Sequence, residues 1–267
     1  MRVLRQEDVQ PLETLSQSVL DEMYEAGQCV LACERKLFET GSNVVAELLG
    51  TDRDFYQWDH YPEGDVYCPG SHAQYYYHSH PPDVRGNGWG EEHGHFHTFL
   101  RQIGFPAEVA KDANPDPDPA SPDTEPPAHL VAISMGFDGK ATRLFTTNRW
   151  VTGEAWCEAP IVARLLRHFH IGHNDPSPMV NQWINAMLVL FRPTVEALLH
   201  ARDDVLAQHP PNAEAHVFDD KNLEVTSISG IDVGEQMTRI IAARDCRVAR
   251  HFKYALVTRQ FNWGWGA

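Results

Sequence analysis

Histidine is concentrated in one short part of this chain, and its spacing there constrains the fold. Seven of the 15 histidines lie between residues 60 and 97. Five of them take alternate positions in two aromatic-rich segments, residues 74–80 and 93–101, and these are His78, His80, His93, His95 and His97. Alternate side chains of a β-strand lie on one face. The spacing therefore predicts two strands that pair across the intervening loop and bring up to five imidazoles to one face of a sheet.

The rest of the chain mixes helical and strand-like patterns. Apolar residues at helical spacing predict helices over residues 11–39, 44–49 and 160–170, a longer helix from residue 177 that Pro193 should kink, and a final helix from Asp232. Strand patterns cover residues 130–135, 141–147, 213–219 and 223–231. Strands and helices do not alternate regularly, which argues against a doubly wound fold. The predicted class is α+β: an antiparallel sheet, able to close as a barrel, with helices packed on one face and helical N- and C-terminal parts.

One segment differs sharply from its surroundings. Residues 111–128 hold six prolines and five acidic residues with little apolar content. This composition predicts a surface loop or a disordered insert. Because strand patterns resume directly after it, we expect residues 1–267 to form a single domain.

The charge of the chain narrows the classes of partner. Lys and Arg number 22 and Asp and Glu number 37, which gives a formal charge of −15. Nucleic acids and anionic membranes attract basic surfaces, so we expect neither as a partner. The first residues lack the apolar core of a secretion signal, and no stretch approaches a membrane span. We therefore expect a cytoplasmic protein, whose oligomeric state is open, with a homodimer as one option.

The clustered histidines point to metal chemistry. Imidazole is the commonest metal ligand near neutral pH because it is largely neutral there and offers a lone pair. Two ligands from a His-x-His pair and a third from the neighbouring strand would leave positions open for water or substrate. The candidate metal ligands are His78, His80, His93, His95 and His97. His129, at the start of the next predicted strand, could also contribute.

Other side chains could serve the same site. Glu92 could add an oxygen ligand or act as a base, and Tyr76 shares the face of His78, where it could donate a proton. Arg101 shares the parity of His97 and could hold a substrate carboxylate or phosphate. Arg143 and Arg149 are further candidates for that role, although an ordinary ion pair is the alternative for each arginine.

The arrangement His78-Ser79-His80 and His95-Phe96-His97 is similar to the sites of cupin-type iron enzymes and of carbonic-anhydrase-like zinc proteins, which place His-x-His on sheet strands. The resemblance covers about 25 residues. The cupin pattern also expects a glutamate a few residues after the pair. Here Glu91 follows His80 only eleven residues later, and no glutamate follows His97 in that way, so the resemblance implies no family membership.

Two further features have structural alternatives. The run Gly86-Asn87-Gly88-Trp89-Gly90 could be a lid over the histidines or a plain hairpin loop. A second group, His168, His170 and His173, fits the C-terminal end of a helix, where the macrodipole favours histidine, and a second metal site is the alternative.

The sequence favours a metal-dependent enzyme with a mononuclear, His-rich site. Iron is the first choice of metal, with non-haem oxygen chemistry on a small organic substrate, and zinc or copper also accept imidazole. Zinc-dependent hydrolysis or lyase chemistry is the nearest alternative. A non-catalytic metal-binding protein, acting as sensor, carrier or structural site, is a second alternative, and a partner-binding protein with incidental histidines is a third.

Overall fold

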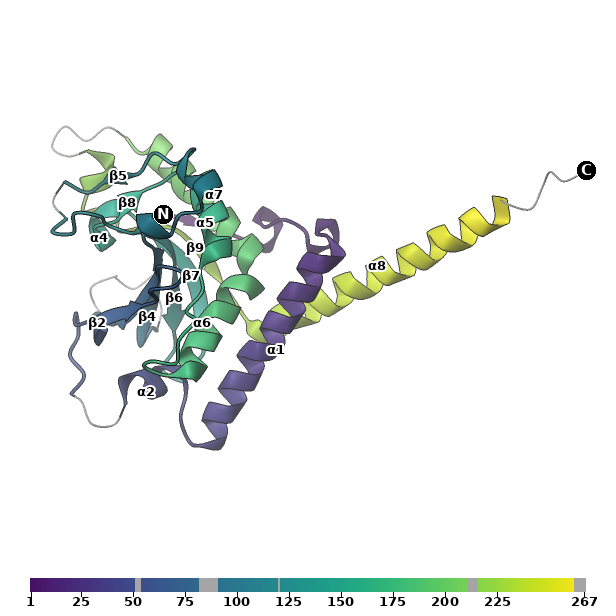
Figure 1. Ribbon diagram of the computed structural model, residues 1–267, viewed down its shortest axis with the longest axis horizontal. Helices are drawn as coiled ribbons and strands as arrows, with labels where there is room; N and C mark the ends of the chain where they lie inside the picture. The colour runs from purple at the N-terminus through teal and green to yellow at the C-terminus, as the bar shows by residue number, and fades with distance from the viewer. Residues whose placement is uncertain (51–53, 82–90, 120, 211–215, 262–267) are drawn as a thin grey trace, which may run out of the picture.

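A computed structural model describes residues 1–50, 54–81, 91–119, 121–210 and 216–261, with the backbone alone for 248–261. Its centre is a seven-stranded sheet in the order β1-β9-β7-β6-β4-β3-β2 (Figure 1). The strands are β1 Arg2–Val3, β2 Tyr61–Tyr67, β3 Ala73–His78, β4 Gly94–Leu100, β6 Ala128–Met135, β7 Ala141–Thr147 and β9 Val225–Gly230. Neighbours are antiparallel except β1 and β9, which are parallel. Strands β1 and β2 remain as edges, so the expectation that the sheet could close into a barrel is wrong.

Helices cover one face of this sheet in two layers. The helices in the described part of the chain are α1 Gln17–Glu39, α2 Val44–Leu49, α3 Ala107–Ala110, α4 Arg149–Thr152, α5 Ala159–Leu165, α6 Pro178–Leu190, α7 Arg192–Gln208 and α8 Val233–Phe261. Helices α5, α6 and α7 lie next to the sheet. Helix α1 packs on the side of α6 that faces away from the sheet, and α8 crosses α1 (Figure 1). Short 3-10 turns are η1 Gln6–Asp8, η2 Leu12–Thr14, η3 Gln102–Gly104, η4 Leu166–His168 and η5 Val217–Asp219. The expectation of helical ends is met in part, because the chain begins with β1 at the sheet edge.

The long helices begin where the sequence provides caps. The Ser16 hydroxyl accepts the Val19 N–H at 3.3 Å at the start of α1, and Ser177 accepts the Val180 N–H at 3.5 Å at the start of α6. Asn43 caps α2, and its side-chain oxygen accepts the Ala46 N–H at 2.9 Å. The predicted kink is a break at Phe191, which separates α6 from α7 just before Pro193.

The structure tests three expected elements to different extents. The predicted strand 213–219 lies partly outside the described residues, and its described end forms η5. The segment 111–128 contains the two-residue strand β5 Asp116–Pro117, which pairs with β8 Ala155–Trp156 to form a second small sheet. The glycine-rich run 86–90 lies outside the described residues.

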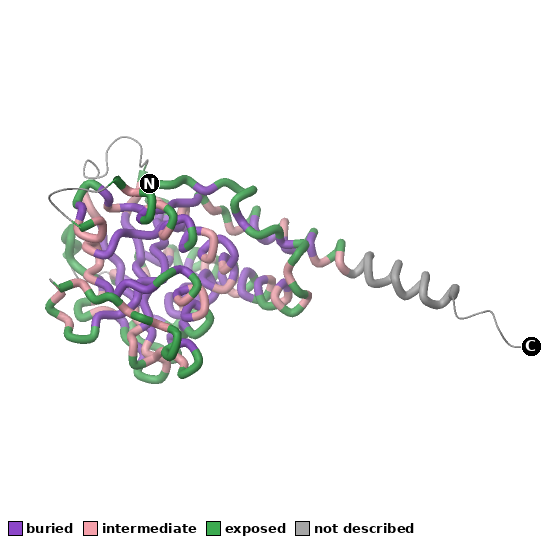
Figure 2. The backbone as a smooth tube through the Cα atoms, turned by 90° about the horizontal axis from the view of Figure 1, so that it is seen from above, coloured by how far each residue is buried: buried purple, intermediate pink, exposed green. Residues whose placement is uncertain are grey.

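The two faces of the central sheet have different neighbours. On β3 and β4, Tyr75 and Phe96 face the helices: the Tyr75 hydroxyl donates to Asn181 Oδ1 at 2.6 Å, and the Phe96 ring lies 5.8 Å from that of Trp183. Their neighbours in the chain face the opposite side, where Phe145 belongs to a smaller apolar cluster with residues of β6 and β9. Figure 2 shows the buried backbone gathered at the centre of the molecule. Both faces of the middle strands are therefore shielded from water.

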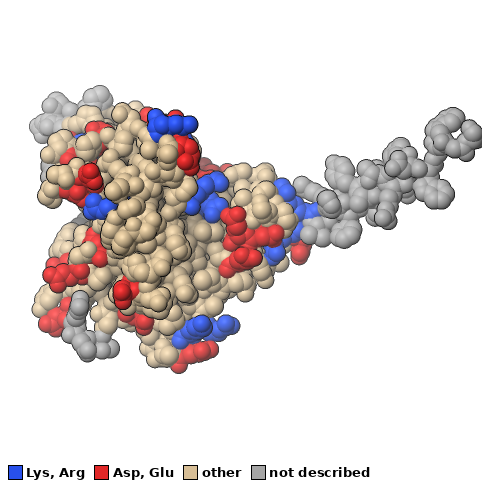
Figure 3. Space-filling model, viewed as in Figure 1, with Lys and Arg blue, Asp and Glu red and all other residues tan. Residues whose placement is uncertain are grey.

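The surface carries the acidic excess of the sequence. On the face drawn in Figure 3, Asp and Glu side chains are spread over the molecule, and the described Lys and Arg form no continuous patch in that view. Within the described part of the chain, no helix has both the length and the apolar character that crossing a bilayer requires.

Candidate metal centre

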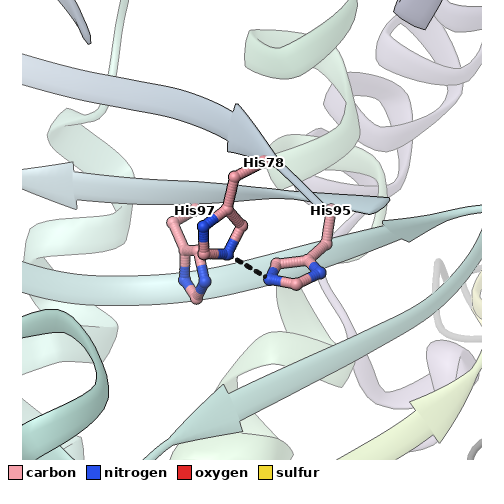
Figure 4. Close-up of side chains that lie close together, drawn as sticks. All are labelled: His78, His95 and His97. Carbon is pink, nitrogen blue, oxygen red and sulfur yellow. Dashed lines mark hydrogen bonds between the residues drawn. The ribbon is translucent and has the colours of Figure 1, made fainter. Parts of the chain in front are cut away.

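Three of the predicted histidines meet on the face of the sheet opposite the helices. His78 lies directly across from His95 in the β3–β4 register, and His97 lies across from Tyr76. One nitrogen from each of His78, His95 and His97 lies within 4.8 Å of the other two, and Figure 4 shows the three rings on one side of the strands. The alternation of two paired strands therefore produces the cluster, as the His-x-His spacing predicts.

The cluster is shielded from solvent. His95 and His97 are fully buried, and His78 is 9% exposed. The Nε2 atoms of His78 and His95 are 2.6 Å apart, so one of the two donates a hydrogen bond to the other. With metal–nitrogen bonds of about 2.05 Å in a tetrahedral site, the same two atoms would stand ~3.3 Å apart. A small rotation of the rings would therefore admit an ion.

The Glu92 carboxylate contacts the Nδ1 atom of His95. Glu92 Oε2 lies 3.3 Å from His95 Nδ1, and Glu92 Oε1 accepts a hydrogen bond from the Ser134 hydroxyl. A carboxylate on Nδ1 selects the tautomer whose Nε2 lone pair is available to a metal. The roles expected for Glu92, oxygen ligand or base, stay predictions. Its contact with His95 is that of a hydrogen-bond partner that orients the ring.

A buried histidine holds His97 in a similar way. His97 Nδ1 lies 3.0 Å from His129 Nε2. Burial and the positive charge of Arg202 lower the pKa of His129 to about 3, so His129 is neutral at physiological pH. Its backbone N–H donates to Glu154 Oε2 at 3.0 Å. Burial raises the pKa of Glu154 to about 7. His129 thus orients His97, a candidate ligand. No local pattern in the sequence signalled Glu154.

The remaining predicted ligands lie beside the cluster. The His80 ring centroid is 4.8 Å from that of His78, and the His80 ring stacks on Trp58. His93 departs from the predicted face: regular strand begins one residue later, at Gly94, and His93 Nδ1 lies 2.6 Å from the Tyr77 hydroxyl, on the helix side. The alternation therefore placed His93 wrongly.

The two other predicted catalytic residues lie in different places. Tyr76 is on the expected face, with its ring 5.2 Å from His97 and 5.4 Å from His78. Burial raises the pKa of its hydroxyl, so Tyr76 stays protonated. Arg101 follows the end of β4, donates to Gln74 at 2.9 Å and pairs with Asp123 at 2.9 Å. Its described contacts are those of an ordinary ion pair and not of the histidine cluster.

The second histidine group is also separate. His173 Nε2 lies 3.1 Å from the Tyr67 carbonyl oxygen, and His168 and His170 are exposed after the end of α5. Among the described residues, the group that could hold a metal ion is that of His78, His95 and His97. The predicted alternative of a second metal site therefore has no support from these three residues.

The cluster could hold a metal ion through three imidazoles. In a tetrahedral site this would leave one position for a further ligand. The Phe145 ring, 5.2 Å from His95 and 6.1 Å from His97, forms an apolar wall beside them. Metal identity does not follow from this donor set, since several divalent metals accept imidazole.

The comparisons with known proteins add a family and no activity. No curated protein and no solved structure matches the chain. The family described as a domain of unknown function, DUF6969, matches residues 24–231, which include all three histidines of the cluster. This match covers more than half of the chain, which therefore belongs to that family.

Proposed function

We propose that this protein is a metal-dependent enzyme whose mononuclear centre is held by His78, His95 and His97. The observation that carries the proposal is the convergence of three buried imidazole nitrogens within 4.8 Å of one another. Buried polar side chains are costly unless they have partners. A divalent ion would give all three lone pairs one common partner.

The groups that contact the Nδ1 atoms of His95 and His97 support a metal-binding role for these histidines. Glu92 lies against His95 Nδ1 and His129 against His97 Nδ1, at 3.3 and 3.0 Å. Such outer hydrogen bonds fix the ring orientation of metal-binding histidines. The arrangement fits a metal site in which the other nitrogen of each of these two rings is the ligand.

The number of ligands favours catalysis over a closed structural site. Structural zinc sites use four protein ligands, whereas catalytic ones use three and keep a position for water or substrate. Iron(II) with oxygen chemistry on a small organic substrate is the first reaction to test, and hydrolysis or lyase chemistry by zinc-bound water is the second. The donor set is compatible with both, and also with copper.

One contact favours a second candidate function. The His80 ring lies 4.8 Å from His78 and 5.2 Å from His95. If His80 became a fourth ligand, the site would be closed, and the protein would be a metal-binding module without catalysis. X-ray absorption of the metal-loaded protein and of His80→Ala distinguishes the two: an unchanged count of three imidazoles in both supports catalysis, and a fourth that is lost in the variant supports the closed site.

The first experiment is elemental analysis of tag-free protein, wild type against the double variant His95→Ala/His97→Ala. The matched control is His168→Ala/His170→Ala, which removes two exposed histidines outside the cluster. We expect about one equivalent of iron, zinc or copper in the wild type and the control, and none in the cluster variant. Absence of metal in all three, before and after anaerobic reconstitution, would overturn the proposal.

A further inference from the structure

A further histidine lies at the solvent-exposed edge of the candidate metal centre. The His60 ring is 5.7 Å from the His78 ring and stacks on the Tyr76 ring at 3.6 Å. The His60 side chain is 44% exposed. Within the cluster, His78 is 9% exposed, whereas His95 and His97 have no exposed surface. His60 therefore lies on the side from which water can approach the cluster.

A carboxylate fixes the orientation of the His60 ring. Asp65 Oδ1 lies 3.0 Å from His60 Nδ1, and Gln74 Nε2 donates to Asp65 Oδ2 at 2.6 Å. Gln74 Oε1 accepts from Arg101 Nε at 2.9 Å, and Arg101 pairs with Asp123 at 2.9 Å. This chain of contacts holds the Asp65 carboxylate in place, and the carboxylate in turn holds the His60 ring.

The backbone of β2 is bent where it presents Asp65. The pairing of β2 with β3 shifts register between Tyr61 and Val66, and Asp65 has a positive φ of 61°. Residues other than glycine seldom adopt this conformation, although aspartate is one that tolerates it. Such irregularities redirect side chains and are frequent next to active sites. The conformation of Asp65 is therefore one that a functional role of its side chain would account for.

The contact with Asp65 determines which nitrogen of His60 carries the hydrogen. A carboxylate accepts a hydrogen bond, so Nδ1 of neutral His60 carries the hydrogen and Nε2 keeps its lone pair. Within the described part of the chain, His60 Nε2 has no hydrogen-bond partner. A hydrogen-bond acceptor of fixed orientation is thus available beside the cluster.

We infer that His60 Nε2 accepts a hydrogen bond from the ligand at the open position of the metal. This ligand belongs to the class that coordinates through an oxygen bearing a hydrogen, such as water or an alcohol. Asp65 is the positioning residue that keeps Nε2 able to accept. The inference rests on the proposed function, because it needs the metal held by His78, His95 and His97. It makes His60 select such oxygen ligands over anions that have no hydrogen to donate.

NMR of the histidine rings tests the geometry without a substrate. In Zn²⁺-loaded protein with ¹⁵N-labelled histidine, the ring signals show which nitrogen is protonated. Co²⁺ in place of Zn²⁺ displaces the signals of rings near the metal. We expect the hydrogen of His60 on Nδ1 and a clear displacement by Co²⁺. His168, an exposed histidine of the separate group, is the reference and should shift far less. Loss of the signals in His60→Phe and His168→Ala assigns them.

Azide binding to the Co²⁺-loaded protein, followed by the visible spectrum of Co²⁺, tests the hydrogen bond itself. Azide has to displace the water that His60 holds, and it offers no hydrogen to Nε2. His60→Phe keeps a ring that can stack on Tyr76 but has no acceptor. This variant should therefore bind azide about three- to tenfold more tightly than the wild type.

Asp65→Asn tests the positioning role. The asparagine amide can donate to His60 Nδ1, and the hydrogen of His60 would then move to Nε2, where it can donate to azide. Asparagine also tolerates a positive φ, so the backbone can be kept. The NMR should show the hydrogen on Nε2, and azide should bind at least about threefold more tightly. Asp59→Asn removes a neighbouring exposed carboxylate and should change both readouts less. An unchanged tautomer in Asp65→Asn would overturn the role of Asp65.

Three results would overturn the role of His60. Equal displacement of the His60 and His168 signals by Co²⁺ would place His60 away from the metal, and a hydrogen on Nε2 of the wild type would remove the acceptor. Equal or weaker azide binding by His60→Phe would show that no hydrogen bond to the ligand is lost. If His60→Phe does not fold, His60→Gln assigns the signals and the wild-type NMR decides. Failure of the proposed function is distinguishable, because the wild type would then take up neither Zn²⁺ nor Co²⁺.

Discussion

The group that contacts the second ring nitrogen differs between His95 and His97. His95 has the Glu92 carboxylate at its Nδ1, and His97 has the neutral His129 there. The candidate ligand His95 thus has a carboxylate as its partner, and the candidate ligand His97 has a neutral imidazole. A carboxylate partner makes imidazole more basic and a stronger donor, so the two ligands should contribute unequally to metal affinity.

Replacing Glu92 by glutamine should weaken metal binding by about 10- to 100-fold, because the variant keeps the shape but loses the charge behind His95. Competition with a chromophoric chelator measures the change. Glu91→Gln removes a neighbouring exposed carboxylate and serves as control. Equal affinity in the two variants would show that Glu92 does not support His95.

Glu154 should make the stability of the protein depend on pH. Burial raises its pKa from 4.5 to about 7, so the folded state holds a proton that the unfolded state releases. The resulting stabilisation is complete below pH 4.5 and is lost as the pH rises through 7. The free energy of unfolding of Glu154→Gln, relative to that of the wild type, should therefore increase as the pH rises from 4.5 to 7. Above pH 7 the difference should stay constant. Urea unfolding at a series of pH values measures this, and a difference that does not vary with pH would contradict it.

At the scale of elements, strands β3 and β4 hold the three histidines. They are packed so closely that an added side chain at Gly94 has no room. A Cβ on Gly94 would come within 2.5 Å of the His78 carbonyl oxygen and of the Tyr77 hydroxyl. Both neighbours belong to β3, so a side chain there would push the strands apart where His78 faces His95. Gly94 also marks the start of regular strand, and this is why His93 leaves the face that its spacing predicts.

Gly94→Ala should destabilise the protein by about 1–3 kcal/mol, since the added methyl group overpacks a buried contact. It should also lower metal affinity, because His78 and His95 move apart. Gly70→Ala is the matched control, since a Cβ there meets nothing within 4 Å. Chemical unfolding and metal titration of both variants test the prediction, which fails if they behave alike.

At the scale of the whole molecule, the centre joins two strands inside a sheet that is shielded on both faces. An ion bound by His78, His95 and His97 would link β3 to β4 in the native state alone. Ligands that bind only the folded state raise its stability in proportion to the logarithm of their concentration. The metal should therefore act on the stability of the entire fold.

Adding the physiological metal at 100 times its dissociation constant should raise the free energy of unfolding by about 2.7 kcal/mol. A chelator should reverse the gain. Calorimetry of wild type and His95→Ala/His97→Ala provides the comparison, and the variant should not respond. A similar shift in both proteins would place the stabilising metal somewhere other than the cluster.

Local sequence patterns were enough to predict the main helices and strands and the three histidines that meet. Helix α1 follows from its apolar stripe, although it begins at Gln17 and not at residue 11. The meeting of His78, His95 and His97 follows from two-residue alternation in adjacent strands. These are properties of neighbouring residues, which the backbone geometry of a helix or strand imposes wherever the element lies. The open edges of the sheet, the support of His97 by His129, and the burial of Glu154 depend on residues far apart in the chain. So does the contact of Arg101 with Gln74 rather than with the histidines, because strand register is set by burial across the whole sheet.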